Sequence, residues 1–164
     1  MPEMNPATQD VSVYRALHLG FKVQKAGVLT ADDDLFTVVG QVLITLIYGE
    51  VTTVMDGGAS TVALNEKASS IALCAATTIT SDAAGEIYML SGDAGAVVNG
   101  ADAPTLKVGQ LAGTPLAPFV FGLGNGVLGS LTIESTETGD DTGEILWTLF
   151  YIPLEPGAYV AAAA

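Results

Sequence analysis

Residues 144–160 of this chain, EILWTLFYIPLEPGAYV, are apolar at both odd and even positions. In a strand, successive side chains point to opposite faces of the sheet. One face would carry Ile145, Trp147, Leu149 and Tyr151, and the other Leu146, Thr148, Phe150 and Ile152. Small sheets usually keep one face in water. The pattern therefore predicts that the second face is covered, either by the opposite wall of the domain's own barrel or by a sister subunit.

Period-2 segments separated by turn residues dominate the rest of the chain and predict an all-β fold. The predicted strands occupy 35–55, with a bend at Gly40, and then 60–66, 69–80, 86–92, 129–136 and 144–154. Within 35–55, one predicted face carries Phe36, Val38, Val42, Ile44, Leu46 and Tyr48. Turns are expected at 56–58 and 81–85, a surface loop at 93–104, and a hairpin loop at 137–143 that joins the last two strands. We predict one small β-barrel or sandwich domain.

The domain is expected to span residues 35–160, because residues 1–34 lack a sustained period and contain Pro2 and Pro6. An extended N-terminal arm is predicted for 1–34, and a short C-terminal tail for 161–164. The start of the chain has neither a basic segment nor an apolar one, so no export signal is expected. Synthesis in a cytoplasm is the resulting expectation.

Charge excludes several partners. The chain has 18 acidic and five basic residues, a net charge of −13, and only Lys67 and Lys107 are basic after Lys25. A nucleic-acid backbone or an anionic membrane surface would repel it. The longest uncharged stretch, Val108–Ile133, carries several glycines and two prolines and would not span a bilayer as a helix. We expect a soluble protein that binds neither nucleic acid nor membrane.

Motifs that could carry chemistry have weak support. GNGVLG at 124–129 matches a dinucleotide-binding glycine pattern, but the following residues alternate as a strand rather than forming a helix. The acidic segments at 32–34 and 139–144 (GDDTGE) lack the spacing of a calcium-binding loop and indicate solvated turns. His18 has no evident catalytic partner, and Cys74 fits a small buried core residue. We expect no enzyme, and no catalytic, cofactor or metal-binding residue.

Three stretches carry a resemblance to a known family: GEVTT at 49–53, LCAATTITSDAAGEIYMLSGDAG at 73–95 and TGEILWTLFYIPLEPGAYVAA at 142–162. Their order is similar to that in head decoration, or cement, proteins of tailed bacteriophages. The resemblance covers most of residues 35–162, and its closing pattern is the most specific part. It implies a compact β-domain on the outside of the expanded capsid, often a homotrimer, that clamps neighbouring subunits of the major capsid protein. It implies no catalytic site.

Interface residues are expected in three places. Val11, Val13 and Tyr14 in the arm could add a strand to a neighbour's sheet. The apolar run Phe119, Val120, Phe121 and Leu123 is the second candidate, with an ordered lid over the barrel end as its alternative. Leu146, Phe150 and Ile152 on the closing strand are the third. The alternative functions are a phage tail tube or fibre-base subunit and a carbohydrate-binding β-module, in which aromatic side chains would stack on sugar rings.

Overall fold

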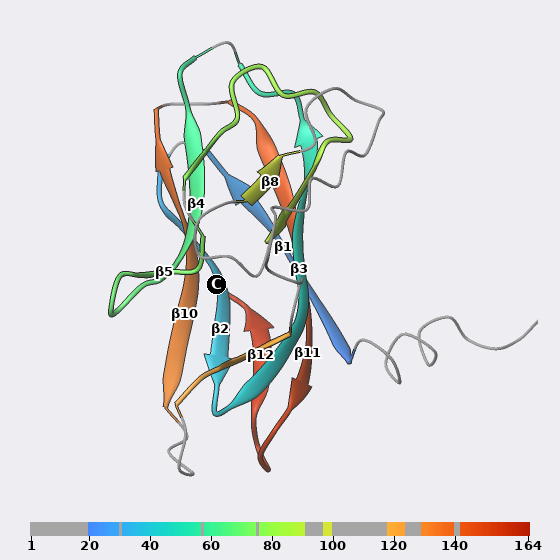
Figure 1. Ribbon diagram of the computed structural model, residues 1–164, viewed down its shortest axis with the longest axis vertical. Helices are drawn as coiled ribbons and strands as arrows, with labels where there is room; N and C mark the ends of the chain where they lie inside the picture. The colour runs from blue at the N-terminus through green and yellow to red at the C-terminus, as the bar shows by residue number, and fades with distance from the viewer. Residues whose placement is uncertain are drawn as a thin grey trace, which may run out of the picture.

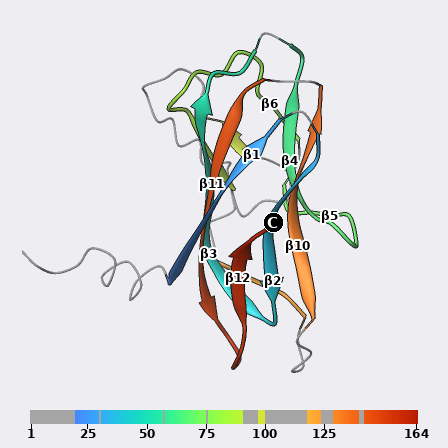
Figure 2. The ribbon, with the colours of Figure 1, turned by 180° about the vertical axis from the view of Figure 1, so that it is seen from behind.

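The computed structural model describes residues 20–29, 31–56, 58–74, 76–90, 97–99, 118–123, 129–139 and 142–164. In these residues, twelve strands form two antiparallel sheets of six strands each, which confirms the predicted all-β class. The sheets face each other with the apolar core between them, so the domain is a β-sandwich (Figures 1 and 2). The described residues contain no helix that is long and apolar enough to cross a membrane.

Each sheet has a five-strand path and one further short strand. Sheet A has the order β1 (Phe21–Val28), β11 (Glu144–Pro153), β3 (Val42–Thr53), β7 (Ile87–Leu90) and β8 (Val97–Asn99), and β9 (Phe119–Phe121) also pairs with β3. Sheet B has the order β12 (Tyr159–Ala162), β2 (Asp33–Val39), β10 (Ser130–Thr138), β4 (Thr61–Glu66) and β5 (Ile71–Ala72), and β6 (Thr77–Thr78) also pairs with β4. On one side of the sandwich, β1 lies against β2 and β12.

Several connections between consecutive strands cross from one sheet to the other. The predicted strand 35–55 is in fact two strands, because the chain turns at Gly40 and Gln41 from β2 in sheet B to β3 in sheet A. The predicted hairpin of the last two long strands is also wrong: β10 pairs with β2 and β4, whereas β11 pairs with β1 and β3. The segment at 137–143 therefore connects two sheets, and the sheets are built from pairings between residues far apart in sequence.

The inner face of β11 forms the centre of the core. Ile145, Trp147 and Leu149 are all at most 2% exposed. Trp147 lies opposite Gly49 of β3, where a Cβ atom would be 3.0 Å from the indole and 2.6 Å from Cγ2 of Ile145. The glycine therefore leaves the space into which the indole packs.

A bulge in β3 changes which side chains point inward. Phe150 pairs with Leu46 and Tyr151 with Ile44, so Thr45 is the extra residue, and its hydroxyl donates to the Phe150 carbonyl at 3.2 Å. An extra residue shifts the alternation by one. Val42, Ile44 and Ile47 are buried in the core, while Leu46 and Tyr48 lie on the outer face of sheet A. The predicted face of 35–55, which also contained Phe36, Val38, Val42 and Ile44, is thus wrong for Leu46 and Tyr48.

Sheet B follows the simple alternation more closely. In β10, Ile133 and Ser135 are fully buried, and Thr132, Glu134 and Thr136 between and beside them are half-buried on the outer face. β2 contains a bulge at Leu35: Ile133 of β10 pairs with Phe36 and Glu134 pairs with Asp34, so Leu35 is the extra residue, and both Leu35 and Phe36 are buried. The predicted strand at 60–66 is confirmed as β4, but 69–80 contains only the short strands β5 and β6. The predicted loop at 93–104 contains β8.

The predicted domain limits need correction at both ends. Residues 21–28, assigned to the arm, form β1 and pair along their whole length with β11. Residues 161–162, assigned to the tail, belong to β12 and pair with β2. The backbone N–H of Ala163 also donates to the Leu35 carbonyl at 3.0 Å. Residues 1–19 lie outside the described part of the chain.

Candidate interaction surfaces

Polar groups in the described residues serve mainly the fold. No group of three or more His, Cys, Asp or Glu side chains among the described residues could hold a metal ion. Asp34 pairs with Lys67, at 2.7 and 2.9 Å from its two carboxylate oxygens to Nζ, and this contact raises the pKa of the lysine. Asp32 accepts a hydrogen bond from the backbone N–H of Glu137 at 3.0 Å. Asp33 and Asp34 lie in β2, so the predicted solvated turn at 32–34 is wrong for these two residues.

Cys74 is a core residue, as predicted, although it lies in a bend and not in a strand. Its side chain is 1% exposed, and the backbone N–H of Leu64 donates to Sγ at 3.2 Å. Burial raises the pKa of the thiol to about 11, and the bond from Leu64 offsets only part of this effect. The thiol is therefore protonated at neutral pH and is a poor nucleophile.

The outer face of sheet A is largely apolar. It carries Ala26 of β1, Leu46 and Tyr48 of β3, Ile87 and Met89 of β7, Val120 of β9, and Leu146, Phe150 and Ile152 of β11. Phe150 is 4% exposed but does not belong to the core cluster. Thr148 beside it is 1% exposed and accepts a hydrogen bond from Nε2 of Gln24 at 3.0 Å.

The structure excludes one of the two predicted covers for the second face of the closing strand, namely the opposite wall of the domain. Leu146, Phe150 and Ile152 point away from sheet B, so the opposite wall of the domain does not cover them. Leu146 is half-buried and Ile152 is 39% exposed. Phe150 is nevertheless only 4% exposed in a single chain, so the chain itself already covers this ring.

Exposed apolar side chains gather at one end of the sandwich, where β2 turns into β3 (the lower end in Figure 1). We call this set the apolar rim: Phe21 57% exposed, Val120 55%, Leu154 46%, Ile152 39% and Leu123 36%. Register places Val120 beside Leu43, and Leu43 beside Ile152, on three neighbouring strands. The ring of Phe21 lies 5.6 Å from that of Tyr151, the residue before Ile152.

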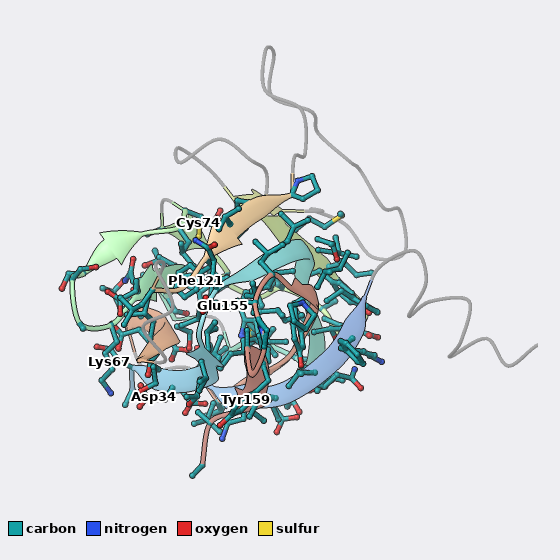
Figure 3. The ribbon with its side chains drawn as sticks, turned by 90° about the horizontal axis from the view of Figure 1, so that it is seen from below. Asp34, Lys67, Cys74, Phe121, Glu155 and Tyr159 are labelled. Atoms are coloured by element: carbon teal, nitrogen blue, oxygen red, sulfur yellow. The ribbon has the colours of Figure 1, made fainter. Side chains whose placement is uncertain are left out.

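Contacts between neighbouring turns fix the positions of the rim residues. The backbone N–H of Gln41 donates to Oε1 of Glu155 at 2.9 Å, and the N–H of Leu154 donates to the Gln41 carbonyl at 3.0 Å. Gly122, with a φ of 119°, packs on the same turn so closely that a Cβ would lie 1.9 Å from the Gly40 carbonyl oxygen. The turn before β3, the turn after β11 and the end of β9 therefore form one cross-linked unit. Figure 3 views this end, with Phe121 and Glu155 toward the middle and Asp34 and Lys67 at the periphery.

The predicted interface residues fall into different environments. Val11, Val13 and Tyr14 lie outside the described residues. Val120, Leu123 and Ile152 are brought together on the rim, and Leu146 and Phe150 lie on the outer face of sheet A.

The other two predicted interface residues point toward the core. Phe121 is 8% exposed and belongs to the core cluster, and Phe119 packs partly buried against it. They alternate with Val120 on β9, whose pairing with β3 places Phe121 opposite the buried Val42. Phe121 is therefore corrected from an interface candidate to a core residue.

Sequence reasoning missed Phe21 and Leu154 as surface residues. Phe21 fell in the predicted arm, and its place on the rim depends on pairing with Tyr151, 130 positions later in the chain. Leu154 begins the sequence LEPG, whose proline and glycine do indicate a turn. A leucine in such a turn could have been predicted to be an exposed apolar residue.

No protein family, curated protein or solved structure matches this chain. Its function is therefore argued from the surfaces described above.

Proposed function

We propose that this protein is a structural virion protein that decorates and stabilises the expanded capsid of a tailed bacteriophage. It would sit on the capsid exterior as a small oligomer, such as a homotrimer, and clamp neighbouring major capsid subunits. It would need no cofactor and catalyse no reaction. The proposal starts from the resemblance of residues 49–53, 73–95 and 142–162 to head decoration proteins.

One observation carries the proposal: the surface of this sandwich is chemically divided. Apolar side chains occupy the outer face of sheet A and the rim, whereas hydroxyl and carboxylate groups occupy the outer face of sheet B. The outer face of sheet A is mostly half-buried, whereas the rim side chains are exposed. Exposed contiguous apolar surface on a stable domain typically marks a protein contact. A protein that coats a shell needs this division, because one side must bind the shell and the other must stay in solvent.

Charge supports a position outside the shell. A chain with a net charge of −13 would be repelled by packaged DNA but tolerated on the exterior. The acidic groups of sheet B would also keep neighbouring decorated particles apart.

The proposed mechanism is avidity. Several weak contacts made by one oligomer gain from a high effective concentration, by factors of roughly 10²–10⁴ when geometry allows simultaneous binding. An oligomer that bridges capsid subunits would resist their separation under internal pressure. Binding would depend on the spacing of the subunits, which changes when the shell expands.

The test is co-sedimentation of the purified full chain with expanded and unexpanded empty heads of the phage that encodes it. We expect saturable binding to expanded heads only, with a number of bound copies per shell that matches the shell symmetry. Heads saturated with the protein should also withstand heating that opens bare expanded heads.

Two outcomes would contradict this function. Absence of binding to either form would exclude a decoration role, and polymerisation into tubes or six-membered rings would then favour a tail subunit. Equal binding to both head forms, without saturation, would indicate nonspecific adhesion. Binding to polysaccharide beads in the absence of any binding to heads would favour a sugar-binding module.

A further inference from the structure

We infer that the apolar rim is the surface through which copies of this chain bind one another. The contact would be made by Phe21, Val120, Leu123, Ile152 and Leu154 of each copy around a symmetry axis. This inference rests on the proposed function, because a decoration protein that bridges capsid subunits acts as an oligomer. Its test, however, needs no capsid.

Charge distribution argues for a second copy as the occupant. Two chains of charge −13 repel each other, so they can associate only where carboxylates are sparse. Among the acidic residues that the structure describes, Glu155 is the one next to the rim side chains, because Glu144 lies at the far end of β11, where it pairs with Val28 and Thr53. Contact through this end would keep the acidic groups at the opposite end, such as Asp56, Asp82 and Glu144, far apart.

The rim is also close to neutral and able to complement itself. Glu155 is half-buried and already accepts the N–H of Gln41, and Lys22, beside Phe21 on β1, is exposed. A contact between identical surfaces places each residue of one copy against a different residue of the other. One cation and one carboxylate at the same end can thus face each other across the contact.

The rim needs little ordering before it binds. Its residues come from β1, β9 and β11 and from the turns next to them, which the Gln41, Leu154 and Gly122 contacts tie together. Surfaces that are already rigid lose less conformational entropy on association. Neighbouring residues of β9 have different roles: Phe121, 8% exposed, packs into the core, whereas Val120, 55% exposed, faces outward.

The experiment is sedimentation velocity over a dilution series of the full-length chain, with a pair of matched variants. Val120→Asp places a charge on the rim. Val54→Asp places the same charge on a valine that is also 55% exposed but follows β3 at the opposite end. We expect the wild-type chain to be oligomeric and Val120→Asp to raise its dissociation constant at least about tenfold, because the new carboxylate would be desolvated in the contact. Val54→Asp should leave the constant unchanged.

Leu154→Asp provides a second variant outside any strand. It should weaken association as Val120→Asp does, so a local disturbance of β9 would not explain both results. Near-ultraviolet circular dichroism, which reports the packing of Trp147, should be unchanged in all three variants.

The inference would be overturned by a wild-type chain that stays monomeric at the highest soluble concentration, or by Val54→Asp weakening association as much as Val120→Asp. A monomeric chain whose binding to heads is reduced by Val120→Asp would assign the rim to the capsid and likewise overturn it. An oligomer that depends on the rim but binds no heads would instead overturn the proposed function alone.

Discussion

The outer faces of the two sheets differ although both belong to one sandwich. On sheet B, polar groups meet each other: Asn65 donates to the Thr136 hydroxyl at 2.7 Å, and Lys67 pairs with Asp34. On sheet A, leucine, isoleucine, methionine and aromatic side chains occupy the corresponding positions, and Phe150 is buried there outside the core. Core formation requires only the inner faces to be apolar. Much of this outer face is already shielded within one chain, so it is the exposed Val120 and Ile152 that point to a demand other than folding.

Neighbouring residues of one strand also differ in their surroundings. A residue such as Phe121 is buried by its own domain, whereas Val120 is exposed and available for association. Substitutions of side chains in different environments should therefore differ in their cost to the free energy of unfolding, and four comparisons test this.

The largest effect is expected from a charge on the inner face of β9. Phe121→Asp should cost at least about 4 kcal/mol of unfolding free energy, since it removes a buried ring and buries a carboxylate. Val120→Asp should change it by less than about 1 kcal/mol. Urea unfolding followed by Trp147 fluorescence measures both. A folded, stable Phe121→Asp variant would contradict the inward placement of this side chain.

The two faces of β11 provide the next comparison. Trp147→Ala should cost about 3–5 kcal/mol, because the indole fills the space over Gly49 in the core. Phe150→Ala should cost less, about 2 kcal/mol, because the ring lies outside the core cluster. Both values come from urea unfolding. Equal losses would mean that the outer face of sheet A is packed as a second core.

The sequence predicts the strands better than their partners. Alternation in SLTIEST and the turn residues of SDAAG identify β10 and the turn before β7, because these signals are local. Pairing is not local: β1 joins β11 across more than 100 residues, and β10 and β11, adjacent in sequence, belong to different sheets. The local sequence pattern of two consecutive strands is the same whether they form a hairpin or belong to two different sheets. The hairpin of β10 and β11 was wrongly predicted for this reason.

Bulges limit what alternation can predict about a surface. One extra residue at Thr45 moves Leu46 and Tyr48 from the predicted inner face to the outer one. The doubly apolar character of β11 was visible in sequence, but the rim was not, since it joins segments that only pairing with β3 brings together. Phe121 and Val120 illustrate the same limit, because an apolar triplet does not reveal which residue faces the core.

Hydroxyl groups on the two outer faces provide a smaller, matched test. Thr148→Val on sheet A should cost about 1 kcal/mol, because Thr148 is buried and its bond to Gln24 is lost. Thr136→Val on sheet B removes the partner of Asn65 but should cost less than about 0.5 kcal/mol, since water can reach the half-buried amide. Thermal unfolding of the two variants gives the difference. A larger loss for Thr136→Val would show that the sheet B hydroxyls are the structural ones.

The smallest effect concerns pH and is expected from sheet B. Glu66 accepts hydrogen bonds from the Ser69 hydroxyl and from the backbone N–H groups of Ser69 and Ala68, the last two at 2.7 and 3.1 Å. The bond from the Ser69 hydroxyl contributes most to lowering the pKa of Glu66 below its ordinary value of 4.5. The folded state thus binds this proton less readily than the unfolded state does.

The contribution of ionised Glu66 should therefore be complete above the unfolded pKa of about 4.5 and be lost as the pH falls through the lower folded value. Glu66→Gln should be less stable than wild type at pH 7, by under about 1 kcal/mol. As the pH falls below about 4.5 and through the lower folded pKa, the difference should shrink. Urea unfolding at pH 7 and at pH 3 measures this convergence, with Thr148→Val as a control whose deficit should stay constant. A deficit for Glu66→Gln that is independent of pH would mean that shape, not charge, is what the turn at 67–70 requires.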